Sequence, residues 1–136
     1  MTEENKKSFY ITTTLPYVNS KPHIGFALEV IRADAIARYK RQMGYDVFFN
    51  TGTDEHGLKI AQKAEESGQT PQEYTDEMSE HFKAIKSPLN LSYDRFIRTT
   101  DEDHVKAAEE FWKRCDEAGY IYKKKYSGLY CVGDEM

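Results

Sequence analysis

Two short segments of the sequence carry the side chains best suited to chemistry. The first contains His23 and Gly25, directly after Pro22 and at the start of a long amphipathic run. The second, "TGTDEHG", contains Asp54 and His56. A histidine at a helix start can donate a hydrogen bond to a phosphate, and glycine lets a ligand approach the backbone. The carboxylate of Asp54 suits an ammonium group better than a phosphate.

Each segment follows a predicted strand, and a helix is predicted between the two strands. Residues 9–14 and 46–53 are rich in β-branched and aromatic side chains, whereas residues 24–43 place apolar side chains at spacings of three and four. This order predicts a right-handed parallel βαβ unit. Ligands of open α/β sheets bind at the carboxyl ends of the strands. We therefore expect one crevice that contains His23, Asp54, Glu55 and His56, with Pro16 and Tyr17 as its wall.

Local signals predict the other elements of the chain. The apolar residues that mark one face of the first helix are Ile24, Leu28, Ile31, Ala35 and Tyr39. A second helix should cover residues 56–66 and end near Gly68, and Thr70 with Glu73 should form a capping box for a third. "DRFIRTT" predicts a strand, and Thr100 or Asp101 should cap a last helix that ends at Gly119. Residues 120–132 alternate well enough for a strand or hairpin.

Composition restricts the functions that this chain can have. It has 136 residues and a net charge of −4, so a broadly basic nucleic-acid surface is excluded. We find no dinucleotide or P-loop fingerprint, no HExxH motif and no metal-ligand spacing among the histidines, so no metal site is predicted. Cys115 and Cys131 are too few for a disulfide framework. Without a signal peptide or an apolar run of membrane-spanning length, we expect a cytoplasmic protein with no membrane partner.

Longer stretches of the sequence resemble a known family. "TLPYVNSKPHIGFALEVIRADAIARYKRQMGYDVFFNTGTDEHGLKIAQKA", "SYDRFIRTTDEDH" and "GYIYKKKYSGLYCVGDE" resemble the start of the catalytic domain of methionyl-tRNA synthetases, which are class I aminoacyl-tRNA synthetases. The resemblance implies an α/β, Rossmann-type (HUP-like) parallel sheet with flanking helices, of which this chain is the N-terminal half. It also implies a tail at residues 1–7, the first half of the catalytic domain at 8–122, and the start of an inserted connective domain at 123–136.

The resemblance also implies an activity and assigns residues to it. The expected reaction is activation of L-methionine with ATP and Mg²⁺ to methionyl-adenylate, followed by transfer to tRNA(Met), which is bound mainly by parts outside this chain. We expect the chain to be a piece of a longer protein, with little activity by itself. The ATP side, within the signature region from Tyr17 to Ala27, is assigned to Pro22, His23, Ile24, Gly25 and Phe26, with His23 as the catalytic residue. The methionine side is assigned to Thr14, Leu15, Tyr17, Asp54 and His56.

Two positions depart from the family pattern. The family signature ends in a second histidine, and Phe26 stands there instead. A phenyl ring cannot donate to a phosphate oxygen. A catalytically degenerate methionine- or nucleotide-binding module therefore stays open as the alternative function. Many relatives have a second cysteine three positions after Cys131, where this chain has Asp134, so zinc is not predicted here. A different nucleotidyltransferase would share the His-x-Gly element but not "TGTDEHG" together with "YSGLYCV".

Overall fold

The computed structural model describes residues 6–131 of the chain. The chain divides into two compact units, Met1–Val105 and Lys106–Met136. The first unit holds the sheet and its helices, and the second holds most of the last helix and the segment after it.

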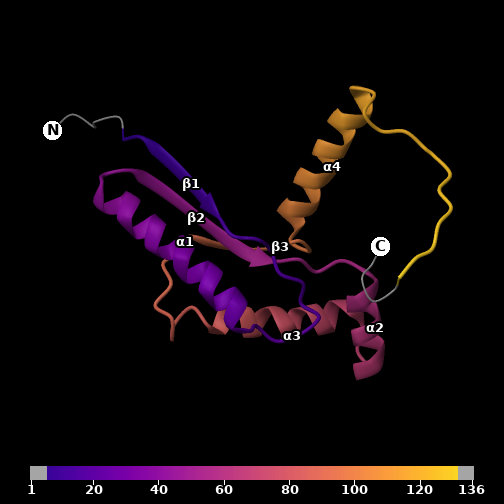
Figure 1. Cartoon of the computed structure of the whole chain (residues 1–136), viewed down its shortest axis with the longest axis horizontal. Helices are drawn as coiled ribbons and strands as arrows, with labels where there is room; N and C mark the ends of the chain where they lie inside the picture. The colour runs from indigo at the N-terminus through magenta and orange to yellow at the C-terminus, as the bar shows by residue number, and fades with distance from the viewer. Residues whose placement is uncertain (1–5, 132–136) are drawn as a thin grey trace. The chain divides into compact units, whose positions relative to one another are not determined.

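The first unit is built on a parallel sheet. Its strands are β1 (Ser8–Thr12), β2 (Asp46–Thr53) and β3 (Arg95–Arg98), in the order β1-β2-β3. Helix α1 (Ile24–Gln42) connects β1 to β2 and lies along both strands (Figure 1). The predicted parallel βαβ unit is thus confirmed. β1 ends two residues before the predicted boundary, because the amide of Thr14 bonds to the side chain of Glu29, 2.7 Å away, rather than to a strand.

The face that α1 buries differs from the row of apolar residues in its sequence. Its buried residues are Phe26, Val30, Ala33, Asp34 and Ala37. Ile24, Leu28 and Tyr39 are exposed instead, Ile24 by 86%. The spacing correctly predicted a helix, since both rows have helical period. It could not identify the buried row, because that row contains two alanines and an aspartate.

Helices α2 (Leu58–Ser67) and α3 (Pro71–Ala84) follow β2. Gly68 ends α2 in the left-handed conformation, at φ 70°, which a glycine adopts without strain. The predicted capping box of α3 is confirmed, with Thr70 Oγ1 accepting from the amide of Glu73 and the Glu73 carboxylate accepting from the amide of Thr70. The core lies between α1, α2, α3 and the sheet; its largest buried members are Val18, Phe26, Val30, Phe49, Ile60, Met78, Phe82, Leu91 and Tyr93.

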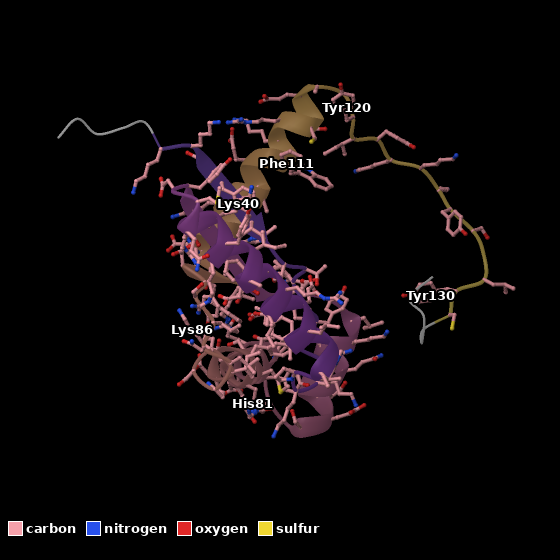
Figure 2. The ribbon with its side chains drawn as sticks, turned by 60° about the vertical axis from the view of Figure 1, so that its left-hand side comes forward. Lys40, His81, Lys86, Phe111, Tyr120 and Tyr130 are labelled. Carbon is pink, nitrogen blue, oxygen red and sulfur yellow. The ribbon has the colours of Figure 1, made fainter. Side chains whose placement is uncertain are left out.

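A buried carboxylate fixes α1 to the segment before β3. Asp34 accepts from the amide and the hydroxyl of Ser92, at 2.6 and 2.7 Å, and pairs with Arg38. Burial opposes the charge, but the hydrogen bonds from Ser92 and Arg38 outweigh it and lower the pKa of Asp34. Lysines cover aromatic rings at the margins of this unit. Lys40 lies 5.0 Å from the ring centre of Phe9, and Lys86 lies 3.9 Å from that of Tyr93; both lysines are labelled in Figure 2.

Helix α4 (Glu102–Glu117) begins in the first unit and continues into the second. Gly119 follows it at φ 76°, as predicted. In the second unit, Phe111, Tyr120 and Tyr130 are exposed by 70%, 79% and 61%; all three are labelled in Figure 2. Residues 120–131 form no helix or strand, so the expected strand or hairpin is wrong for this described stretch. The domain boundary at 122 stays a prediction, and most of the predicted tail (residues 1–5) lies outside the described residues.

Candidate functional site

The loops that follow β1 and β2 pair with each other beyond the ends of the strands. The amide of Asp54 donates to the carbonyl of Pro16 at 2.9 Å, and the amide of Val18 donates to the carbonyl of Asp54 at 3.3 Å. Tyr17 and Asp54 therefore form an isolated parallel bridge. The predicted neighbourhood of the two loops is confirmed, and the backbone of Asp54 is held on both sides.

The side chain of Asp54 is half-buried and makes no hydrogen bond or ion pair with any residue within 6–131. The ring of Tyr17 lies over Gly57, since a Cβ built on Gly57 would lie 3.6 Å from Tyr17 Oη. A carboxylate that is fixed through its backbone and has no partner of its own can accept hydrogen bonds from a cationic ligand. The carboxylate of Asp54 therefore suits an ammonium group.

The carboxylate of Glu55 is buried in an ion pair and is not offered to a ligand beside Asp54, contrary to the expectation from sequence. Glu55 is 4% exposed, and its two carboxylate oxygens bind the guanidinium of Arg98 at 2.8 Å each. The hydroxyls of Thr53 and Thr100 also donate to it. Successive side chains of an extended segment point to opposite sides, so Asp54 and Glu55 diverge. Burial of a carboxylate requires such pairing, because the charge is otherwise too costly to desolvate.

Arg98 is the residue of this region that sequence reasoning missed. Its guanidinium also binds Asp76 of α3 at 2.6 Å, and the pKa of Arg98 is raised, first by its hydrogen bond with Glu55 and further by Asp76. The usable signal was the register of the sheet, which pairs Arg98 with Thr53, two positions before Glu55. That register follows only once β2 and β3 are known to be neighbours.

His56 is exposed, and its Nε2 lies 3.2 Å from the carbonyl of Thr99. A carbonyl only accepts, so Nε2 carries the proton and Nδ1 is left as an acceptor in the neutral ring. The amide of Glu55 donates to Thr99 Oγ1 at 2.8 Å, so the same threonine holds two consecutive residues of the turn. A cavity of about 360 Å³ lies beside His56; its lining is Glu55, His56, Thr70, Pro71, Gln72, Thr75 and Thr100.

His23 is the N-cap residue of α1. Its Nδ1 accepts from the amide of Gly25 at 3.0 Å, which leaves the proton of the neutral ring on Nε2. The side chain is exposed, and Nε2 is a donor located at a helix N-terminus, where the dipole also favours an anion. The tight fit explains Gly25, because a Cβ there would lie 2.7 Å from His23 Cε1.

Phe26 lies in the core. It is 5% exposed, and its ring meets that of Phe82 edge to face, with the centroids 5.2 Å apart. Such aromatic pairs are favourable beyond the area they bury. The side chain is therefore part of the packing between α1 and α3, and only the backbone of Phe26 is placed at the helix start. Of its neighbours in the motif, Ile24 is exposed and Pro22 is half-buried.

The two ends of the region assigned to ATP, Tyr17 and Ala27, have different surroundings. Tyr17 pairs with Asp54 and so lies on the side assigned to methionine. Ala27 is half-buried, and its amide donates to the carbonyl of His23 at 3.2 Å, which closes the first turn of α1. Ala27 therefore offers a ligand neither a polar side chain nor a free amide. Its contribution is to the helix that carries His23.

Thr14 and Leu15 lie in the loop after β1. The amide and the hydroxyl of Thr14 both donate to the carboxylate of Glu29, each at 2.7 Å. Glu29 projects from the second turn of α1, so this pair joins the loop to the helix that starts with His23. Sequence reasoning did not single out Glu29, because a glutamate within a helix is ordinarily a solvated side chain.

Residues 6–131 contain no group of three or more His, Cys, Asp or Glu side chains placed to hold a metal ion. Asp134, where relatives of the resembled family have a cysteine, lies outside the described residues. None of the helices in the described part is long and apolar enough to cross a membrane.

Comparison with known proteins places this geometry in a family. Residues 9–136 match the family described as tRNA synthetases class I (M). The chain therefore belongs to the class I tRNA synthetases, and within them to the group of the methionine enzymes. The methionine–tRNA ligase of Thermotoga maritima is 57% identical over 91% of this chain and 20% of its own length. That of Mycobacterium leprae is 54% identical over 95% of this chain and 24% of its own length.

Solved structures agree with this assignment. The Mycobacterium tuberculosis methionyl-tRNA synthetase in complex with methionyl-adenylate superposes with a TM-score of 0.90 and 51% identity, over 96% of this chain and 26% of that chain. An Agrobacterium radiobacter LeuRS in a ternary complex is 23% identical, with a TM-score of 0.82, and shows the fold alone. The Rossmann-like fold implied by the resemblance is confirmed. This chain spans about a fifth to a quarter of the relatives it matches.

Proposed function

We propose that this chain is the N-terminal part of the catalytic domain of a methionine–tRNA ligase. The full-length protein would activate L-methionine with ATP and then transfer the methionyl group to tRNA(Met) in the cytoplasm. The observation that carries the proposal is the 51% identity and TM-score of 0.90 to a methionyl-tRNA synthetase in complex with methionyl-adenylate. The carboxylate of Asp54, which has no partner within residues 6–131, gives that likeness a chemical basis in this chain.

In the proposed reaction, a carboxylate oxygen of methionine attacks the α-phosphorus of ATP, and pyrophosphate leaves. A hydroxyl at the tRNA 3′ end then attacks the methionyl carbonyl, and AMP leaves. No protein nucleophile is required, so the residues act by positioning and by stabilising charge. Asp54 would bind the ammonium group, and Thr14, Leu15, Tyr17 and His56 would form the surroundings of the amino acid.

The phosphates would bind at the start of α1, the region assigned to residues 22–26. Nε2–H of His23 would donate to a phosphate oxygen, and the N-terminal amides of α1 would face the negative charge. Mg²⁺ supplies charge neutralisation to bound ATP phosphates in general. The described residues offer no cluster of ligands for it, so none of them is assigned to the ion.

The test is methionine-dependent exchange of pyrophosphate into ATP by the full-length protein that contains this chain. We expect exchange in the wild type, and a drop of about 10- to 100-fold in kcat/KM for methionine in Asp54→Asn, because a hydrogen bond to a charged group contributes about 1.5–3 kcal/mol. Asp46→Asn is the matched control, since Asp46 begins β2 and is exposed. A well-folded wild type without exchange would contradict the proposal.

The alternative, a degenerate binding module, rests on Phe26 alone. The position of its ring against Phe82 gives this residue a packing role, which supports the view that the substitution does not mark lost activity. The two functions differ in one further outcome. A degenerate module would fail to exchange pyrophosphate in both the wild type and Phe26→His, whereas the enzyme exchanges pyrophosphate with phenylalanine in place.

A further inference from the structure

We propose that Arg98 is a positioning residue for the methionine side of the site, acting through Glu55 on the turn that presents Asp54 and His56. The inference rests on the proposed function, because it assigns a role within the same site. Arg98 itself touches no assigned substrate-binding residue. Its guanidinium is joined to Glu55 by two parallel hydrogen bonds of 2.8 Å, a geometry that fixes direction as well as distance.

The contacts of Glu55 show how its position contributes to that of Asp54, whose backbone also pairs with Pro16 and Val18. Its carboxylate is held by Arg98 and by the hydroxyls of Thr53 and Thr100, and its amide is held by Thr99. Asp54 is the preceding residue on an extended backbone, so its side chain points to the side opposite Glu55. A rotation that releases Glu55 would therefore also change the direction of the Asp54 carboxylate.

Arg98 also connects the turn to two other elements. It lies at the last position of β3, where its own amide donates to Asp101 at 3.0 Å, and it binds Asp76 of α3 at 2.6 Å. Asp76 also accepts from Gln72 at 2.9 Å. The turn after β2, strand β3 and α3 thus meet at one arginine, whose side chain is only 15% exposed. A movement of any of these elements would reach Asp54 through Arg98 and Glu55.

Arg95 provides a matched control on the same strand. It lies three residues before Arg98, its side chain is 40% exposed, and it pairs with Asp103 and Asp101. Arg95→Met removes an arginine–carboxylate pair of β3 and leaves the guanidinium contacts of Arg98 with Glu55 and Asp76 in place. Arg98→Lys keeps the charge but cannot form the two parallel bonds.

Loss of Arg98 alone would leave Glu55 charged and buried, which endangers folding. The double variant Glu55→Gln with Arg98→Leu removes both charges, and Asp76→Asn removes only the outer contact of the guanidinium. These variants keep the proposal testable if Arg98→Leu does not fold. All are made in the full-length protein that contains this chain, with the melting temperature recorded for each.

The first readout is the steady-state kinetics of methionine-dependent pyrophosphate exchange into ATP. For Arg98→Lys and for the double variant, we expect KM for methionine to rise at least about tenfold, since a small misplacement of a binding group has effects of this size. KM for ATP should change less than about threefold, and Asp76→Asn should lie between the wild type and these variants. A rise of both KM values together, or unchanged KM values with a lowered melting temperature, would overturn the proposal in favour of a merely structural pair.

The second readout needs no substrate and separates this proposal from the proposed function. Amide hydrogen exchange at Asp54 and Glu55 should become faster in Arg98→Lys and stay at the wild-type rate in Arg95→Met, because these amides bond to Pro16 and Thr99 only while the turn is held. If the wild type shows no pyrophosphate exchange but amide hydrogen exchange is still faster in Arg98→Lys, the positioning role is supported and the proposed function fails. An unchanged rate of amide hydrogen exchange in Arg98→Lys overturns the positioning role, whatever the activity in pyrophosphate exchange.

Discussion

The two loops of the candidate site are held in very different ways. The turn at residues 54–57 is fixed by the loop after β1, by the loop after β3 and by α3, through backbone pairing and a buried ion pair. The start of α1 is held by local hydrogen bonds from the amides of Gly25 and Ala27 to His23, by the pair of Thr14 with Glu29 and, beneath them, by the ring of Phe26. The side proposed for the amino acid is therefore preorganised by polar contacts, whereas the side proposed for phosphate is anchored from the core.

This difference indicates how the two sides would work. A binding group fixed before the substrate arrives costs little to order on binding. An exposed imidazole at a helix start instead keeps its Nε2 donor available for charge that develops during the reaction. Substitutions in the turn should then act mainly on KM for methionine, and those at the helix start on kcat or on stability.

The largest expected effect concerns the anchor of the phosphate side. Phe26→Ala should lower the free energy of unfolding by about 3–5 kcal/mol, because it removes a buried aromatic ring and leaves a cavity against Phe82. Urea unfolding of the full-length protein monitors this loss. Phe111→Ala is the control, since Phe111 is 70% exposed. An equal, small change in both variants would show that Phe26 does not anchor α1.

His23→Ala should lower kcat for adenylate formation by about 100-fold or more while KM for methionine stays within about threefold of the wild type, because a donor to developing charge acts in the transition state. Exchange kinetics measure both constants. His81→Gln is the matched control; His81 lies on α3 and is labelled in Figure 2. An effect confined to KM for methionine would contradict the division between the two sides.

A smaller effect is expected at the contact that joins the two sides. Glu29→Gln replaces the carboxylate that accepts both bonds from Thr14, and we expect KM for methionine to rise about tenfold, equivalent to about 1.4 kcal/mol. Glu65→Gln on the exposed face of α2 is the control. If KM for ATP rises instead, Thr14 belongs to the phosphate side, and this would contradict its assignment to the amino-acid side.

The smallest effect is the pH dependence of the outer ion pair. The hydrogen bond from Arg98 lowers the pKa of Asp76 below its ordinary value of about 3.9, against a smaller effect of burial. A lowered folded-state pKa gives stability that is present above the unfolded pKa and lost as pH falls through the folded pKa. Asp76→Asn should cost less than about 1 kcal/mol at pH 7, because the side chain is 51% exposed.

Acid titration of unfolding in both proteins checks this sign. The difference between wild type and Asp76→Asn should shrink as the pH falls below about 4 and disappear once Asp76 is protonated. A difference that is constant from pH 7 to the acid limit would mean that the ion pair with Arg98 contributes nothing to stability.

Local signals in the sequence predicted the framework well. The helix start at Thr70 and the stops at Gly68 and Gly119 depend on the chemistry of a few neighbouring residues, and all three are as predicted. β2 has the predicted bounds, Asp46–Thr53, because the run of aromatic and β-branched residues is bounded by turn signals. Contacts between residues far apart in the sequence could not be predicted from such local signals.

The misses share a physical cause. The burial of Glu55 depends on Arg98, 43 residues later, and the burial of Phe26 depends on Phe82 on another helix. The unassigned role of Glu29 likewise depends on Thr14, across the β1–α1 loop. The expected strand or hairpin in the segment after Gly119 failed because alternation gives strand propensity, but a strand needs a partner, and residues 120–131 have none in the described part of the chain.

The most direct test of the central claim is calorimetric titration of methionine into the full-length protein without ATP, for the wild type and Asp54→Asn. A preorganised amino-acid side predicts methionine binding by the wild type in the absence of ATP, and at least about tenfold weaker binding by Asp54→Asn. The same affinity in both proteins, or binding by the wild type only when ATP is present, would contradict it.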